Sequence, residues 1–202
     1  MMRECDIMYA NEAMPDYVGF VFAGEKRRIS HDSAAAFRKI LSDKIPAVGV
    51  FVDEDINVVA GLLNEGIINI AQLHGNEGSG YISDLKGMTG CRVIKAVRVT
   101  SGDDITDAHK LDADYLLLDA YKKGMPGGTG ESFSWDIINK AYHSIPEVER
   151  KPFFIAGGIN TGNVCEAVSF GPYGVDVSTG IETDGHKDRD KMIEIVRRVR
   201  NV

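Results

Sequence analysis

The sequence has few cysteines, and no apolar run in it is long enough to cross a membrane. Its 202 residues contain three widely spaced cysteines, Cys5, Cys91 and Cys165, without a C-x-x-C pair. This argues against a disulfide framework or a zinc site. A membrane-spanning helix needs about 20 apolar residues, and a signal peptide needs an uninterrupted apolar core. Neither pattern is found, so we expect a cytoplasmic protein.

An excess of positive charge is also absent. The formal net charge is -7, which argues against binding to nucleic acid or to an anionic membrane surface. An anionic ligand would therefore have to be attracted by local basic groups, against the overall field of the protein. The share of hydrophobic residues, 44%, is that of an ordinary globular protein, and no linker divides the chain. We expect one domain over residues 1–202.

Short apolar segments alternate with longer mixed ones along the chain. The apolar segments are rich in valine, isoleucine and phenylalanine, and most show no alternation with polar residues, as is typical of parallel strands covered on both faces. They are YVGFVF (ending at Phe22), Ala47–Val52, Ile67–Leu73, Arg92–Val97, Tyr115–Asp119, Pro152–Gly158 and Tyr173–Thr179.

The segments between the strands have helical spacing, which is clearest in Ser30–Leu41, Asn57–Glu65, Asn163–Phe170 and Lys191–Val199. The residues before the first strand also predict a helix. Alternating strands and helices are typical of a doubly wound sheet or of a (β/α)8 barrel. Because the glycine-rich loops follow the last two strands, we expect an α/β barrel of the TIM type. Only seven of its eight strands are counted, and the first strand is the one missing.

Two glycine-rich loops are candidates for binding phosphate. IAGGINTGN contributes Gly157 and Gly158, and VSTGIE contributes Ser178, Thr179 and Gly180. Glycines let backbone N–H groups approach an anion closely. Either loop alone is also explained as a tight turn. The occurrence of both at consecutive strand ends favours a phosphate site.

Other polar residues follow predicted strands. Asp119 ends a buried strand, where it is either a general acid or the N-cap of a helix. The segment after it, Tyr121–Glu131, is a glycine-rich candidate lid. Arg27, in the basic run KRR, could bind a carboxylate or belong to a solvated loop. His74 could line the pocket or be structural, and Lys95 could face the barrel interior or pair with a carboxylate.

Seven segments follow one another along the chain: GFVFAGEKRRIS, VGVFV, AQLHG, VIKAV, LLLDA…GGTGESFSW, IAGGINTGNV and GVDVSTGIE. Their sequences and their order resemble those of the phosphoribosylanthranilate isomerases of tryptophan biosynthesis. The resemblance runs from about Asp6 to the C-terminus. It implies an Amadori rearrangement of N-(5-phosphoribosyl)anthranilate, in which an aminoaldose becomes an aminoketose without a metal or organic cofactor. The substrate is a small molecule.

The resemblance also implies roles for individual residues. Asp119 matches the family's general acid, and Arg27 matches the arginine that holds the anthranilate carboxylate. Gln72, His74 and Asp176 match residues that line the substrate pocket. The phosphate loops of the family match Gly157, Gly158, Ser178, Thr179 and Gly180.

The resemblance departs at the start of the chain. In the family, a cysteine that acts as general base lies in a K-I-C-G type segment at the end of the first strand. Aligned backwards from Gly19, that segment falls before Met1, and none of the three cysteines replaces it. Three explanations of the missing segment stay open. The sequence is incomplete, the protein is a variant that has lost this base, or another chain fills the position of the first strand.

These departures leave alternatives open. Open barrel edges invite pairing with another chain, so we expect self-association and little activity from these residues alone. The alternative functions are an impaired barrel that only binds a phosphate ligand, and another phosphosugar enzyme of epimerase or indoleglycerol-phosphate type.

Overall fold

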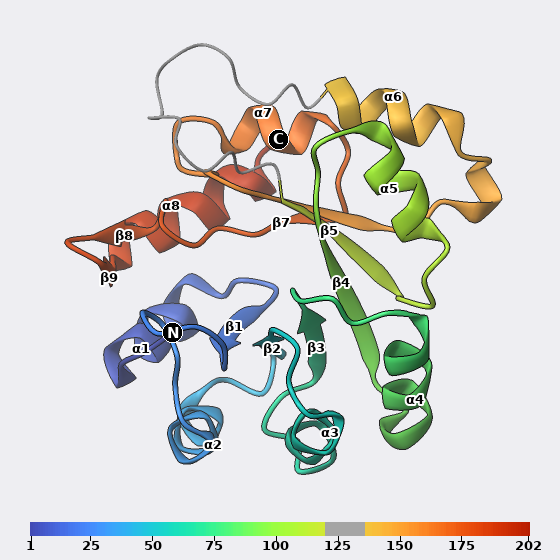
Figure 1. Ribbon diagram of the computed structural model, residues 1–202. Helices are drawn as coiled ribbons and strands as arrows, with labels where there is room; N and C mark the ends of the chain where they lie inside the picture. The colour runs from blue at the N-terminus through green and yellow to red at the C-terminus, as the bar shows by residue number, and fades with distance from the viewer. Residues whose placement is uncertain (120–135) are drawn as a thin grey trace.

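Seven parallel strands, hydrogen-bonded in chain order, form the centre of the molecule in the computed structural model, which describes residues 1–119 and 136–202. The strands are β1 (Val18–Val21), β2 (Ala47–Phe51), β3 (Ile70–Leu73), β4 (Arg92–Arg98), β5 (Tyr115–Asp119), β6 (Phe153–Ala156) and β7 (Gly174–Val175). A doubly wound sheet would reverse its strand order at a switch point. The unbroken order seen in Figure 1 is that of a barrel, as the sequence predicts.

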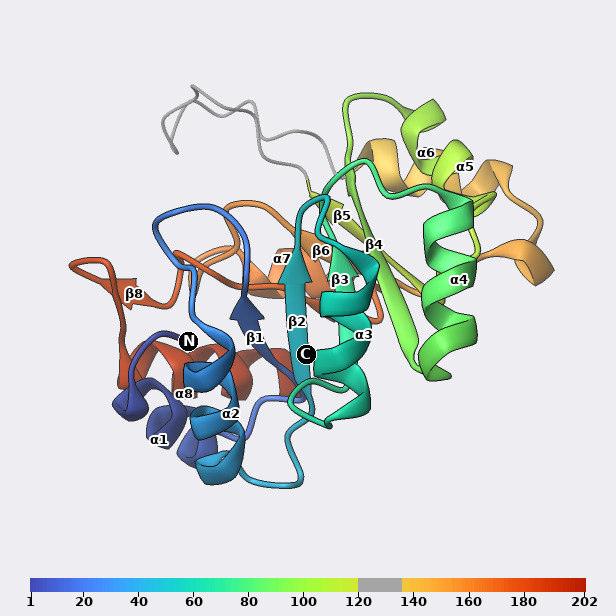
Figure 2. The same ribbon diagram turned by 60° about the horizontal axis from the view of Figure 1, so that its bottom comes forward.

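Helices cover the outer face of this sheet (Figure 2). They are α1 (Glu4–Ala13), α2 (His31–Ile40), α3 (Ile56–Asn64), α4 (Ser79–Thr89), α5 (Gly102–His109), α6 (Asp136–Ser144), α7 (Val164–Ser169) and α8 (Arg189–Arg200), with a 3-10 turn at Glu147–Glu149. Ser30 caps α2 by accepting a hydrogen bond from the Ser33 amide. Arg189 of α8 donates to Glu12 of α1 at 2.7 Å, so the helical layer joins the two ends of the described chain.

The core has two parts, one on each face of the sheet. The smaller part fills the inside of the curved sheet with Val48, Ile70, Ile94, Leu117 and Phe154. The larger part lies between the strands and the helices. Strands buried on both faces show no polar alternation, which explains why the sequence segments are continuously apolar.

The predicted strands and helices lie where the sequence places them. Most of their ends agree within two residues, and two ends differ by more. The expected strand Tyr173–Thr179 is wrong beyond Val175, because β7 has two residues and the chain then turns into a loop. The expected strand Ile67–Leu73 begins three residues later, because Ile67 and Ile68 donate to Leu62 O and close the end of α3. In the described ranges, no helix has the length and apolar character that a membrane span requires.

The strands β1 and β7 form the two edges of the described sheet. Tyr17, just before β1, and Tyr173, just before β7, bring their hydroxyl oxygens to 3.4 Å from one another. At the edge of β1, the amino group of Met1 donates to Gly19 O at 3.0 Å. A large cavity lies between the two edges and continues to the carboxyl ends of the strands.

Candidate active site

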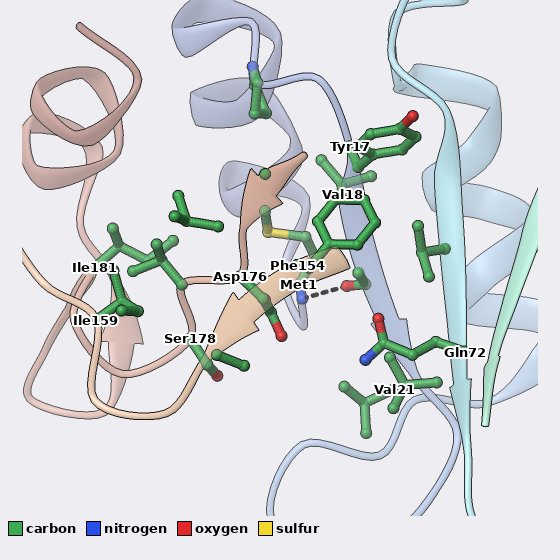
Figure 3. A pocket seen from close by; sticks show the side chains of 18 of the residues that line it. Met1, Tyr17, Val18, Val21, Gln72, Phe154, Ile159, Asp176, Ser178 and Ile181 are labelled. Carbon is green, nitrogen blue, oxygen red and sulfur yellow. Dashed lines mark hydrogen bonds between the residues drawn. The ribbon is translucent and has the colours of Figure 1, made fainter. Parts of the chain in front are cut away.

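The cavity has a volume of about 1500 Å³ and contains the candidate site. Its lining includes residues from the N-terminal half of the chain (Arg27, Gln72, His74) and from the C-terminal half (Asp119, Gly157, Gly158, Asp176, Ser178, Thr179). Of the residues for which the resemblance implies a role, Gly180 alone is not part of the lining. Because parallel strands all end at the same edge, residues far apart in the sequence meet here. Figure 3 shows the side chains of Gln72, on β3, and of Asp176, just after β7, directed into the cavity.

Gln72 and His74 lie on neighbouring positions of the same face of β3 and its extension. The amide nitrogen of Gln72 is 2.5 Å from Nε2 of His74. The side-chain amide of Gln72 and the imidazole of His74 are therefore hydrogen-bonded to each other. Burial lowers the pKa of His74, while the carboxylates of Asp176 and Asp119 counter this in part. His74 is therefore neutral at pH 7 and available as a hydrogen-bonding group.

Two carboxyl groups approach the cavity from different strands. Asp119 is the last residue of β5, and its carbonyl accepts from Val99 N at 3.1 Å. Asp176 follows β7, and its amide donates to Ile155 O at 2.9 Å. The side chain of Asp176 is exposed to the cavity. The surrounding protein nevertheless removes its carboxyl from bulk water and thereby raises the pKa of this group, and the negative charge of Asp119 raises that pKa further. The two backbone hydrogen bonds, at Asp119 O and Asp176 N, fix the strand ends that carry these carboxyl groups.

The two glycine loops are joined to each other by their backbones. Gly157 and Gly158 have φ angles of +94° and +70°, which side-chain-bearing residues rarely adopt. A parallel bridge pairs Asn160 with Gly180. A Cβ atom at Gly180 would lie 2.0 Å from Ile159 O, so only glycine permits this approach. Gly180 thus holds the two loops together and does not itself reach the cavity.

Arg27 differs from the two basic residues beside it. Lys26 and Arg28 are exposed, whereas Arg27 is half-buried, and both Lys26 and Arg27 line the cavity. Its Nη2 donates to Glu182 Oε2 at 3.1 Å. Glu182 begins β8 (Glu182–Thr183), which pairs with β9 (His186–Lys187) in a small antiparallel hairpin. The sequence pattern does not single out Glu182, because Ser178, Thr179 and Gly180 are the residues of VSTGIE that indicate a phosphate loop.

Lys95 does not face the inside of the barrel. It is buried, and its Nζ donates to Glu77 Oε2 at 2.9 Å, to Leu73 O at 3.2 Å and to Gly75 O at 2.6 Å. The two carbonyl groups flank His74 in sequence. Of the two alternatives that the sequence left open, pairing with a carboxylate is the correct one.

The cysteines lie away from the cavity. Cys5 is on α1, Cys91 precedes β4 and Cys165 is on α7, as the sequence predicts, and none of the three lines the cavity. The expected lid, Tyr121–Glu131 with its four glycines, lies outside the described residues. Within residues 1–119 and 136–202, no group of three or more His, Cys, Asp or Glu side chains is placed to hold a metal ion.

Comparison with known proteins agrees with this geometry. Residues 2–198 match the family model described as N-(5'phosphoribosyl)anthranilate (PRA) isomerase. An N-(5'-phosphoribosyl)anthranilate isomerase of Endomicrobium trichonymphae is 43% identical over 203 residues, which cover 100% of this chain and 96% of the relative.

Solved structures give the same result. The crystal structure of phosphoribosyl anthranilate isomerase from Thermotoga maritima has a TM-score of 0.85 and 29% identity, covering 100% of this chain and 96% of that one. A phosphoribosyl anthranilate isomerase in complex with reduced 1-(o-carboxyphenylamino)-1-deoxyribulose 5-phosphate has a TM-score of 0.82 and 28% identity, with the same coverage. The chain belongs to the N-(5'-phosphoribosyl)anthranilate isomerase family.

Proposed function

We propose that this chain catalyses the Amadori rearrangement of N-(5'-phosphoribosyl)anthranilate in tryptophan biosynthesis, as a cytoplasmic enzyme without a metal or organic cofactor. The observation that supports this best is the meeting of Asp119, Arg27 and two glycine loops at one cavity. These groups supply a proton donor, a cation for a carboxylate and backbone N–H groups for a phosphate. The substrate carries both of these anions.

Each group has a defined part in the proposed reaction. The glycine loops bind the 5'-phosphate, and Arg27 binds the anthranilate carboxylate. Asp119 gives its proton to the ring oxygen as the bond from that oxygen to C1' breaks and the nitrogen lone pair forms a Schiff base. Transfer of the C2' proton to a base then gives an enolamine, which tautomerises to the ketose. Gln72, His74 and Asp176 line the space around the sugar.

The test is turnover of N-(5'-phosphoribosyl)anthranilate by the purified protein, with the product identified by chromatography and mass spectrometry. Addition of EDTA should leave the rate unchanged. In parallel, the coding sequence is introduced into a tryptophan auxotroph that lacks this isomerase. Absence of both turnover and growth would exclude the proposed activity for this chain.

A second function, binding of a phosphate ligand without turnover, is favoured by one observation. None of the three cysteines lines the cavity, whereas the resemblance implies that a cysteine removes the C2' proton. Calorimetric binding of reduced 1-(o-carboxyphenylamino)-1-deoxyribulose 5-phosphate, combined with no turnover of substrate, would support this second function.

The edges of the described sheet suggest self-association. The strands β1 and β7 each have only one partner strand within the described chain, and unpaired strand edges favour pairing with another chain. We propose a homo-oligomer formed through these edges. Light scattering during gel filtration measures the mass, and a stable monomer at micromolar concentration would contradict the proposal.

Replacement of Gly180 by alanine should separate the two glycine loops. The new Cβ would meet backbone atoms, Ile159 O at 2.0 Å and Asn160 Cα at 2.7 Å, and backbone atoms cannot turn away as a side chain can. We expect a loss of stability of about 1–3 kcal/mol and weaker binding of inorganic phosphate. Gly87→Ala is the control, because it lies inside α4 with no atom within 4 Å of the added carbon. Unchanged phosphate affinity would show that the loops do not bind phosphate.

A further inference from the structure

Glu182 is a carboxylate held between two cations at the edge of the cavity. Its Oε2 accepts from Arg27 at 3.1 Å, and its Oε1 accepts from Lys187 Nζ at 2.9 Å. The side chains of Glu182 and Lys187 are each 9% exposed, whereas that of Arg27 is 36% exposed. Arg27 therefore has one N–H group bonded to a buried partner and keeps part of its guanidinium accessible to the cavity.

Lys187 extends this contact to the second glycine loop. Its Nζ also donates to Ser178 O at 2.8 Å, so one ammonium group holds both the loop and Glu182. The hairpin of β8 and β9 sets Glu182 directly opposite Lys187. Two further bonds fix the hairpin, from Lys191 Nζ to Glu182 O at 2.7 Å and from Arg3 Nη2 to Lys187 O at 3.2 Å. Arg27 and the Ser178 loop are thus connected through two side chains of a fixed hairpin, those of Glu182 and Lys187.

Glu182 carries a negative charge at neutral pH. Burial alone would raise the pKa of its carboxyl, but hydrogen bonds from Lys187 and Arg27 more than offset this and lower the pKa. Hydrogen bonds between charged partners are about twice as strong as neutral ones and more restrictive in geometry. The position of the Arg27 guanidinium relative to the Ser178 loop is therefore determined by the Glu182 carboxylate.

We propose that Glu182 is a positioning residue, which sets the distance between Arg27 and the Ser178 loop so that the site selects ligands carrying both a carboxylate and a phosphate. The proposal rests on the proposed function, in which Arg27 binds the carboxylate and the loop binds the phosphate. Glu182 itself does not touch the reacting atoms. It acts through Arg27 and, by way of Lys187, through the loop.

The experiment compares two probes by calorimetry, the reduced 1-(o-carboxyphenylamino)-1-deoxyribulose 5-phosphate and its counterpart without the carboxyl group. Glu182→Gln keeps the shape of the side chain and removes its charge. We expect this variant to bind the carboxylate probe about tenfold more weakly and the other probe within about threefold of the original protein. Arg27→Ala should show the same selective loss, and the double variant should lose no more than Arg27→Ala alone.

The outcomes separate this inference from the proposed function. If the original protein binds both probes equally, Arg27 does not bind the carboxylate, and both the proposed function and the inference fail. If the original protein distinguishes the probes, three results would contradict the inference alone. Glu182→Gln could weaken the binding of both probes equally, or it could bind the carboxylate probe more tightly. The double variant could also lose more affinity than Arg27→Ala alone. Should Glu182→Gln not fold, Glu182→Asp retracts the carboxylate from Arg27 while keeping the charge, and the same selective loss is expected.

Discussion

Replacement of Asp119 by asparagine should lower kcat by about 10²–10⁴-fold. Asparagine has nearly the same shape and retains a hydrogen-bonding side chain at the end of β5, but it has no acidic proton to give to the ring oxygen. The interaction it removes develops as the ring opens, so kcat and kcat/KM should fall together while KM changes little. Steady-state kinetics with N-(5'-phosphoribosyl)anthranilate measures both parameters.

The matched control is Asp32→Asn, which makes the same chemical change on the exposed surface of α2. It should leave both kinetic parameters close to those of the unchanged protein. The melting temperatures of the two variants should be compared first, so that a loss of activity is not due to unfolding. If folded Asp119→Asn retains full kcat, Asp119 is not the general acid and the role belongs to another group of the cavity.

The sequence is sufficient to predict the strand order and many of the residues that line the cavity, and the reason is physical. Parallel strands buried on both faces require continuous apolar runs, and their carboxyl ends must share one edge. Polar residues directly after such runs, such as Asp119 and His74, are thereby brought to the same cavity. Glycines mark the two loops in the sequence because close backbone approach excludes other residues, as at the Asn160–Gly180 bridge.

The partners of the charged residues could not be predicted in the same way. Arg27 and Glu182 are 155 positions apart, and their contact depends on how the hairpin of β8 and β9 lies against the loop after β1. The side of the sheet on which Lys95 lies follows from the alternation of side chains along β4. It can be predicted only when the register of β4 against its neighbouring strands is known. The composition of VDVSTG predicts a longer strand than β7, although the backbone after Val175 forms a loop.

Replacement of Lys95 by methionine should reduce the free energy of unfolding by about 3–5 kcal/mol, because it leaves the buried Glu77 carboxylate without its cation. Glu77 is 6% exposed, and its Oε1 accepts from Asp53 N at 2.8 Å while Oε2 accepts from Lys95. The pair therefore joins the ends of β2 and β3 to the middle of β4. For a chain of this size we expect the melting temperature to fall by about 6–20 °C. Loss of the bonds to Leu73 O and Gly75 O should also loosen His74 and raise KM.

The control for this prediction is Lys86→Met, the same substitution at a lysine that pairs with Asp112 and Asp114 on the surface. Because water screens that pair, the expected loss is about 1 kcal/mol or less. Lys95→Met combined with Glu77→Leu should recover part of the loss, since an apolar pair leaves no unpaired charge. The comparison uses urea unfolding followed by circular dichroism. Equal losses for the two single variants would mean that Lys95 and Glu77 contribute no more than a surface pair, and that the position of His74 is determined by the strand backbone alone.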